Sequence, residues 1–261
     1  MILTTDPLEC STMVSFGSSV TGPGNAKRSS ACQDAWGRRS WRVSAGVASA
    51  IAIADGMGSK SESRTGARAA TTCALNAARR WTEYPSVGTD WLIRWFEAEW
   101  RYSLGTLDPK ECCTTCWLIV SAPALGVLVM GLGDGLAILA EENGTLECIS
   151  GRDPENFSNE TKALGAPHKA SDWKVCFFPE NGQNRTVILA TDGVADDIMN
   201  DKLESFVTWI RSRGELKNPG RGLRRALERW PVKAHSDDKT IAAMLYKKTS
   251  TDPQDGRNEG E

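Results

Sequence analysis

Aspartate residues follow or precede short apolar runs at four places in the chain, and turn-forming residues flank each of them. The four stretches are Ile53-Ala54-Asp55-Gly56, Gly131-Leu132-Gly133-Asp134-Gly135, Leu189-Ala190-Thr191-Asp192-Gly193 and Ser236-Asp237-Asp238-Lys239-Thr240. A single Asp-Gly pair usually forms an ordinary turn, but turns alone do not account for the same arrangement repeated four times. Carboxylates gathered at one end of a sheet repel each other and raise each other's pKa values unless cations neutralise them. The pattern therefore predicts a site for hard divalent ions, magnesium or manganese, bound through oxygen.

The stretch from Ile51 to Gly58, with the sequence IAIADGMG, is the centre of this pattern. An apolar run that ends abruptly in Asp-Gly-x-Gly predicts a buried strand that delivers the Asp55 carboxylate to a tight turn with exposed backbone. Asp34, in the stretch Cys32-Gln33-Asp34-Ala35, is a further carboxylate that can join it.

Other apolar runs predict the elements that must hold these aspartates. Runs rich in Val, Ile, Leu and Ala predict strands at residues 41–47, 48–54, 113–122, 125–131, 136–140, 146–149, 173–178, 186–190 and 240–246, those from 113 to 149 as one antiparallel meander. Apolar residues at helical spacing predict helices at 65–81, 90–103, 203–213 and 221–230. Because the strands and helices do not alternate as βαβ units, the expected class is α+β, with antiparallel sheets covered by helices.

The composition is that of an ordinary globular chain of 261 residues with a formal net charge of -2. Without a repeat or linker, residues 1–248 are expected to form one domain, and the polar residues 249–261 a disordered tail. The charge offers no field for nucleic acid or an anionic membrane. No apolar run reaches the roughly 20 residues of a membrane span, and no secretory signal is present, so we expect a cytoplasmic protein. The eight cysteines are scattered, which favours reduced thiols over a disulfide framework.

The aspartate motifs resemble, in the same order along the chain, those of the metal-dependent protein phosphatases of the type 2C serine/threonine class. The matching pieces are Cys32-Gln33-Asp34-Ala35, Ile53-Ala54-Asp55-Gly56-Met57-Gly58, Gly133-Asp134-Gly135, Ala190-Thr191-Asp192-Gly193 and Asp237-Asp238-Lys239-Thr240. The CQDA and GDG pieces look most like a bacterial subgroup of that family. The resemblance implies a four-layer αββα sandwich with the metals at one edge of the central sheets.

The resemblance also implies roles for individual residues. Asp55 would bridge two metals, with the Gly56 carbonyl on one of them. Asp192 and Asp237 would bind the second metal. Asp238 is the alternative to Asp237 if the register is shifted by one residue, because an asparagine often follows the ligand in this family.

Two further aspartates have roles in the family pattern. Asp34 would hold metal-bound water, and Asp134 would help to form a third, weaker metal site. The predicted cofactors are therefore two or three Mn2+ or Mg2+ ions. Asp55, Asp192 and Asp34 would together carry catalysis.

This sequence departs from the family pattern in two places. Some relatives have a histidine as a candidate general acid two residues after the bridging aspartate, where Met57 stands here. The family's phosphate-binding arginine has no match in register; Arg28 is the nearest candidate, although a solvated loop arginine is the commoner case. His168 and His235 stand alone, and we interpret both as structural or exposed.

The predicted function is metal-dependent hydrolysis of phosphoserine and phosphothreonine in proteins, by a water activated between two divalent metals. The expected partners are phosphorylated proteins together with a cognate Ser/Thr kinase, and neither nucleic acid nor a membrane. The alternative is a catalytically weak module of the same fold that binds phosphoproteins or has a regulatory role. A chain that only binds has no reason to keep so many mutually repelling acids.

Two other motifs have less support from their surroundings. Cys32 to Arg38 fits the C-x5-R pattern of cysteine-dependent phosphatases, but Asp34 and Trp36 place charge and bulk where that loop needs neither. The basic run from Arg211 to Arg229 could bind an acidic partner, although a solvated helical face is the commoner explanation.

Overall fold

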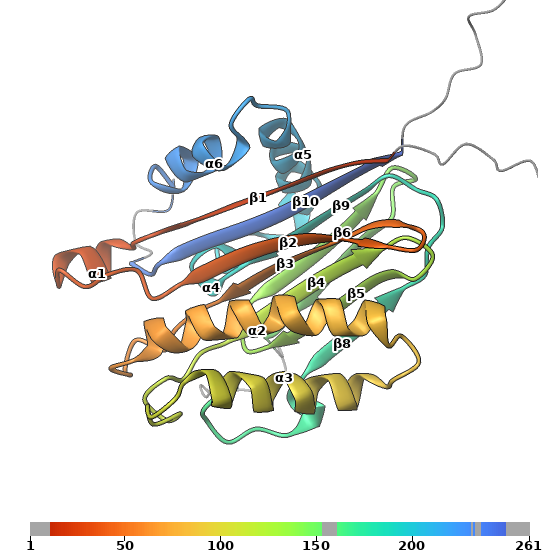
Figure 1. Ribbon diagram of the computed structural model, residues 1–261. Coiled ribbons are helices and arrows are strands. Elements are labelled where there is room, and N and C mark those ends of the chain that lie inside the picture. Colours follow the sequence, from red (N-terminus) through yellow and green to blue (C-terminus); the bar gives the residue numbers. More distant parts are fainter. Residues whose placement is uncertain (1–10, 153–160, 231, 233–235, 249–261) are drawn as a thin grey trace, which may run out of the picture.

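Two antiparallel sheets stack face to face in this computed structural model, which describes residues 11–152, 161–230, 232 and 236–248 (Figure 1). The first sheet has the order β1-β10-β9-β6-β7, and the second has the order β2-β3-β4-β5-β8. The strands of the first sheet are β1 (Ser11–Val20), β10 (Lys239–Lys248), β9 (Arg185–Ala190), β6 (Leu136–Glu141) and β7 (Leu146–Ser150). Those of the second are β2 (Ala35–Val43), β3 (Gly46–Ala54), β4 (Cys116–Ala122), β5 (Gly126–Leu132) and β8 (Lys174–Phe178).

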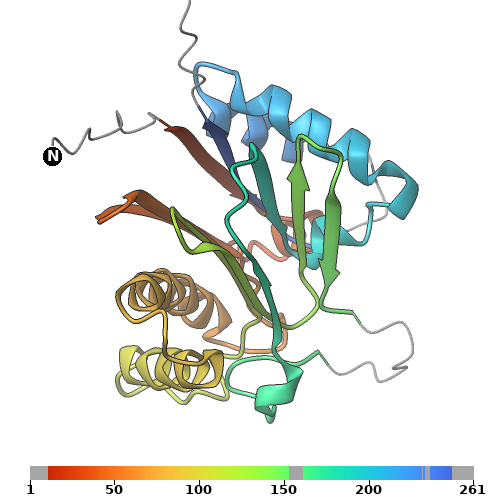
Figure 2. The same cartoon turned by 90° about the vertical axis from the view of Figure 1, so that its right-hand side faces the viewer.

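Helices cover the outer face of each sheet, so that the chain forms four layers (Figure 2). The second sheet is covered by α2 (Ser63–Glu83) and α3 (Thr89–Ser103), and the first by α5 (Leu203–Gly214) and α6 (Pro219–Leu227). Shorter helical pieces are α1 (Pro23–Lys27), α4 (Asp192–Ala195), η1 (Ala170–Asp172) and η2 (Asn200–Lys202). The predicted α+β class and the αββα sandwich are confirmed. Among the described residues, no helix has the length and apolarity that a membrane crossing requires.

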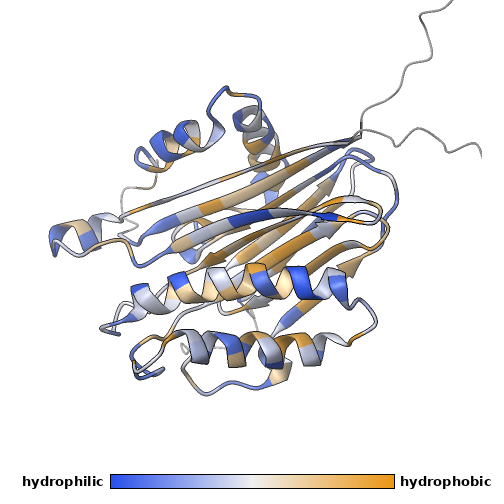
Figure 3. Cartoon of the chain, viewed as in Figure 1, coloured by the Kyte–Doolittle hydropathy of each residue, from blue (hydrophilic) through white to orange (hydrophobic). Residues whose placement is uncertain are grey.

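Strand β3 shows how the sequence specifies the layers. Ala50, Ala52 and Ala54 face α2, while Ile51 and Ile53 face the first sheet and fill the space between the sheets. Successive side chains of a strand point to opposite faces, so the alternation of small and large residues separates a close helix contact from a thick interlayer core. Apolar residues accordingly concentrate on the strands between the helical layers (Figure 3).

Three of the differences between the predicted and the observed elements concern how the strands pair. The sequence predicts no strand at residues 11–20, where β1 forms by pairing with β10 along its whole length. The turn between β2 and β3 lies at Ser44-Ala45, ahead of the predicted boundary, because Gly46 with φ +135° closes the hairpin. The predicted meander is split, because the chain passes from β5 in one sheet to β6 in the other through Gly133-Asp134-Gly135.

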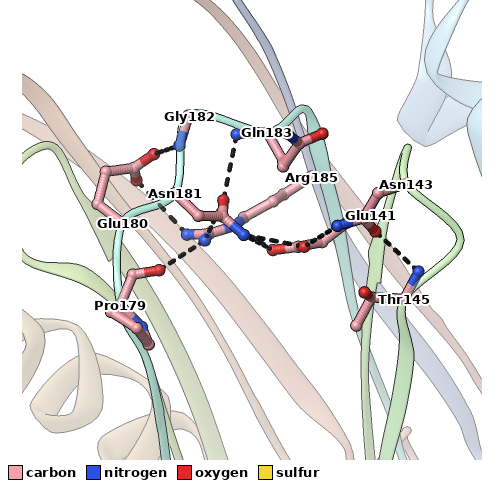
Figure 4. A network of polar contacts seen from close by, with 9 residues as sticks. All are labelled: Glu141, Asn143, Thr145, Pro179, Glu180, Asn181, Gly182, Gln183 and Arg185. Carbon is pink, nitrogen blue, oxygen red and sulfur yellow. Dashed lines mark hydrogen bonds and ion pairs between the residues drawn. The ribbon is translucent and has the colours of Figure 1, made fainter.

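A buried arginine fixes the crossover from β8 to β9, where the chain passes from the second sheet to the first (Figure 4). The guanidinium of Arg185 donates to Glu141 Oε1 at 2.9 Å, to Asn181 Oδ1 at 2.6 Å and to the Pro179 carbonyl at 2.6 Å. Asn181 in turn donates to both oxygens of Glu141. Burial alone would raise the pKa of Glu141, but the hydrogen bonds from Asn181 and Arg185 hold it below the usual value. This network ties the loop after β8 to the first sheet, at the end of β9 opposite to Asp192.

Candidate metal centre

Both sheets bring aspartates to the end of the sandwich where α1 lies, at the left of Figure 1. Asp34 immediately precedes β2 and Asp55 follows β3, and the register of these two strands sets them opposite each other. Asp192 follows β9, while Asp237 and Asp238 precede β10, the neighbour of β9 in the first sheet. The charges of Asp34 and Asp192 both act on the Asp55 carboxyl group and raise its pKa, so the cluster spans the boundary between the sheets.

Backbone contacts hold Asp55 in place after its strand. Its N–H donates to Thr115 Oγ1 at 3.0 Å, and its carbonyl accepts from the Thr115 N–H at 2.9 Å and from Thr114 Oγ1 at 2.8 Å. A Cβ atom at Gly56 would lie 2.8 Å from the backbone of Ser63, so this position requires glycine. The chain around the predicted bridging residue is therefore fixed on both sides.

Asp34 is buried and only partly satisfied. Its Oδ2 atom accepts a hydrogen bond from Thr191 Oγ1 at 2.9 Å. Its Oδ1 atom finds no donor in the part of the chain that the structure describes, and the residue opposite Asp34 in the strand register is another acid, Asp55. Burial, together with the charge of Asp238, raises the pKa of Asp34 to about 7. A buried acceptor without a donor is costly, so a ligand that supplies one is expected here.

Crowding of the acids raises other pKa values at this site. Burial, with the charges of Asp34 and Asp192, raises the pKa of Asp55 well above its usual value. Burial, with the charges of Asp134 and Asp237, raises the pKa of Asp192 to about 6. A divalent cation would reverse these shifts, and the all-oxygen donor set fits magnesium or manganese. As they stand, no three His, Cys, Asp or Glu side chains among the described residues are arranged around one ion position.

The two adjacent aspartates before β10 have different surroundings. Asp238 is buried, and its carboxylate accepts from the Gly22 N–H at 2.7 Å, from Asn25 Nδ2 at 2.9 Å and from the Gln33 N–H at 2.7 Å. Asp237 is exposed, and its charge acts on Asp192. The carboxylate of Asp238 thus holds α1 and the loop before Asp34, which favours Asp237 as the residue that faces a metal.

Asp134 and Arg28 lie at the margin of the cluster. Asp134 lies in the crossing between the sheets, accepts a hydrogen bond from Thr161 Oγ1 at 3.0 Å and is close enough to raise the pKa of Asp192. Arg28 is exposed at the end of α1, where Nη2 donates to Asn25 Oδ1 at 2.7 Å. Because Asn25 also donates to Asp238, Arg28 is linked to the aspartate cluster through one intervening side chain.

Thr191 and Asn25 both contact aspartates of the cluster, although the sequence predicts no role for either. Thr191 lies between β9 and Asp192 and is buried, and its hydroxyl contacts Asp34. A hydroxyl residue directly before a predicted ligand was the available signal. Asn25 had no such signal, because its partner Asp238 is 213 residues away in the chain.

The model of the family described as Protein phosphatase 2C matches residues 21–230. The chain belongs to the protein phosphatase 2C family. The predicted family and the enzyme class, protein serine/threonine phosphatase, are thereby confirmed. No curated protein sequence matches the chain at a significant level.

Solved structures of phosphatases have a similar fold. Stp1, a serine/threonine phosphatase from Staphylococcus aureus, matches with a TM-score of 0.57 and 16% identity over 95% of this chain and 100% of that chain. RsbX in complex with magnesium matches with a TM-score of 0.55 and 16% identity over 90% of this chain and 96% of that one. The phosphatase domain of SpoIIE from Bacillus subtilis matches with a TM-score of 0.54 and 13% identity over 95% of this chain and 98% of that one. At these identities the likeness shows the fold.

Proposed function

We propose that this protein removes phosphate from phosphoserine and phosphothreonine residues of other proteins, with two divalent metal ions as cofactors and a third in a weaker site. The observation that carries the proposal is the convergence of acids from both sheets: Asp34 and Asp55 stand opposite each other at the ends of β2 and β3, and Asp192 after β9 lies close enough to raise the pKa of Asp55. Family membership supports the reaction class. The similar fold of RsbX, whose structure contains magnesium, supports the choice of cofactor.

The residues present have the donor types that such ions need. Asp55 and the Gly56 carbonyl would hold the first ion, Asp55, Asp192 and Asp237 the second, and Asp134 the third. When bound, the ions would lower the pKa of a water molecule for attack on phosphorus and neutralise charge on the phosphoryl oxygens.

The chain's own residues would orient the reactants. Thr191 fixes one oxygen of Asp34, so the free Oδ1 atom is available to accept a hydrogen bond from the attacking water. Arg28, held by Asn25 at the edge of the site, is the proposed phosphate contact. Met57 has no proton to donate, so the leaving seryl or threonyl oxygen takes its proton from water. The proposed substrates are phosphoproteins of a bacterial cytoplasm, with a cognate Ser/Thr kinase.

The test compares hydrolysis of p-nitrophenyl phosphate and of a phosphothreonine peptide with manganese and then with EDTA. We expect manganese-dependent turnover that EDTA removes. Asp55→Asn and Asp192→Asn should each lower turnover by roughly 100-fold or more, because the charge that holds the ions is lost. Asp90→Asn, in the exposed first turn of α3, is the matched control and should keep wild-type turnover.

Calorimetric titration with manganese separates the two function classes. Metal binding without hydrolysis of either substrate would favour the phosphoprotein-binding module. Wild-type turnover in Asp55→Asn would contradict the proposed metal centre.

A further inference from the structure

Strands β1 and β2 are the edge strands of their two sheets, and residues of both line one cleft on the same flank of the sandwich (Figure 2). Each pairs with a single neighbour, β1 with β10 and β2 with β3, so each keeps one unpaired backbone edge among the described residues. The Arg38 guanidinium reaches across and donates to the Ser15 carbonyl of β1. A cleft of about 470 Å³ lies at this crossing, lined by Met13, Val14, Ser15, Arg38, Arg39 and Ser40.

The charge of this flank has one sign. Strand β2 carries Arg38, Arg39 and Arg42, all exposed, while β1 and β3 carry no charged residue. Arg39 donates to Asn76 Oδ1 of α2 at 2.6 Å, and none of the three arginines forms an ion pair within the described residues. In a chain whose net charge is -2, three unneutralised arginines within five residues form a local anion-binding strip.

The chemistry of the strip selects an extended acidic polypeptide. An unpaired strand edge offers alternating N–H and C=O groups that another extended backbone can match. Arginine forms charge-assisted, often bidentate bonds with carboxylates. A second copy of this chain is disfavoured, because edge-to-edge pairing of two β2 strands would bring like charges together. A nucleic acid would match the arginines but not the backbone edge.

Strand β2 leads from the proposed active site to the strip. Strand β2 starts at Ala35, directly after Asp34. At about 3.3 Å per residue, Arg38 lies roughly 13 Å and Arg42 roughly 26 Å along the strand from Asp34. A peptide whose phosphorylated residue is at the aspartate cluster would place residues about four to eight positions away beside these arginines.

We propose that the edge of β2 and the β1–β2 cleft bind an extended acidic segment of the phosphoprotein substrate, about four to eight residues from its phosphorylated residue. The proposal rests on the proposed phosphatase function and adds a substrate preference to it.

The experiment measures kcat and KM for phosphothreonine peptides with a common core. One peptide carries glutamates at the fourth to eighth positions on the N-terminal side, one carries them on the C-terminal side, and one carries glutamines instead. The variant is Arg38→Gln/Arg42→Gln, and the matched control is Arg221→Gln/Arg225→Gln on the exposed face of α6. Hydrolysis of p-nitrophenyl phosphate reports on the site itself.

For the wild type, we expect the KM of one acidic peptide to be about 10-fold lower than that of the glutamine peptide, with similar kcat values. This difference in KM should become smaller at high salt. Arg38→Gln/Arg42→Gln should remove this preference and leave hydrolysis of p-nitrophenyl phosphate unchanged. The α6 control should keep it. Equal KM values for all three peptides in wild type would overturn the proposal, and so would loss of the preference in the α6 control alone.

Two other outcomes would assign the strip differently and also overturn the proposal. A preference that appears only after deletion of residues 249–261, which carry four acidic residues and one arginine, would mean that the chain's own tail occupies it. Competition by a single-stranded oligonucleotide as strong as that by the unphosphorylated acidic peptide would show a response to charge alone. If no substrate is hydrolysed, the phosphatase function fails, and fluorescence anisotropy with the unphosphorylated acidic peptide still decides whether the strip binds it.

Discussion

The Thr191 hydroxyl donates to Asp34 Oδ2 at 2.9 Å and accepts a hydrogen bond from the Thr240 N–H at 3.0 Å. Thr191 directly follows β9 of the first sheet, whereas Asp34 directly precedes β2 of the second. One hydroxyl group therefore connects strand pairing in one sheet to the orientation of a carboxylate delivered by the other.

Replacing Thr191 tests this connection. Thr191→Val keeps the shape but removes the hydrogen bond, so we expect kcat to fall by about 10- to 100-fold, as for other residues that orient metal ligands. Thr191→Ser keeps the hydroxyl and should retain most of the activity. Manganese affinity by calorimetry and the melting temperature are measured in parallel. A fall in melting temperature with unchanged kcat in Thr191→Val would mean that the hydroxyl is only structural.

Asp237 and Asp238 should respond to substitution in different ways. Asp238→Ala leaves three donors without their carboxylate and should lower the free energy of unfolding by about 3 kcal/mol. Asp237→Asn should change it by less than about 0.5 kcal/mol, because the side chain is exposed. The manganese affinity of the Asp237→Asn variant should fall by roughly 10-fold or more. Urea unfolding and calorimetry give the two quantities, and the reverse assignment would be seen as loss of affinity in Asp238→Ala alone.

The Glu97–His168 pair predicts a pH window for stability. His168 Nε2 lies 2.8 Å from Glu97 Oε1, and this hydrogen bond raises the pKa of His168 above 6.5 although burial opposes it. Burial alone would raise the pKa of Glu97, but the bonds from His168 and Trp173 hold it below 4.5. The contribution of His168 is complete below pH 6.5 and is lost as pH rises through its raised pKa. That of Glu97 is complete above pH 4.5 and is lost as pH falls through its lowered pKa.

We therefore expect His168→Gln to destabilise the protein most between pH 4.5 and 6.5, by about 1–2 kcal/mol. The difference from wild type should shrink in alkaline buffer. Urea unfolding at several pH values measures it, and a difference that does not vary with pH would show that packing, not charge, carries the contribution.

The Arg185 network predicts a large and partly reversible loss of stability. Arg185→Met leaves the Glu141 carboxylate buried without its charged partner and should cost about 3–5 kcal/mol. Arg185→Met/Glu141→Leu removes both charges and should recover part of that loss. Chemical denaturation of the two variants gives the comparison. Equal loss in both would indicate that Arg185 acts through packing of its stem.

The sequence predicted that aspartates such as Asp55 and Asp192 lie at strand ends, because each follows a short apolar run and is itself followed by glycine. It could not predict β1, since Ser and Gly at alternate positions hide its pattern. Gly17 stands opposite Trp36 of β2, where a Cβ atom would come within 2.5 Å of the indole ring. Such a contact between strands of different sheets leaves no local signal.

The choice between Asp237 and Asp238 was also beyond local sequence. The two residues are identical and adjacent, and the difference between them comes from donors near the other end of the chain. Gly22 and Gln33 donate to Asp238 across 216 and 205 residues. Only the folded chain shows that Asp238, and not Asp237, accepts these hydrogen bonds.

The aspartate cluster is divided between two sheets, and this has a mechanical consequence. Apolar side chains such as Ile51, Ile119 and Met244 determine how one sheet rests on the other. A shear of about 1 Å between the sheets would move Asp55 relative to Asp192, and displacements of that size can cost about 100-fold in rate. The turnover rate therefore depends on how the two sheets are aligned. Substitutions that repack the core between the sheets, far from the aspartates, should change that rate.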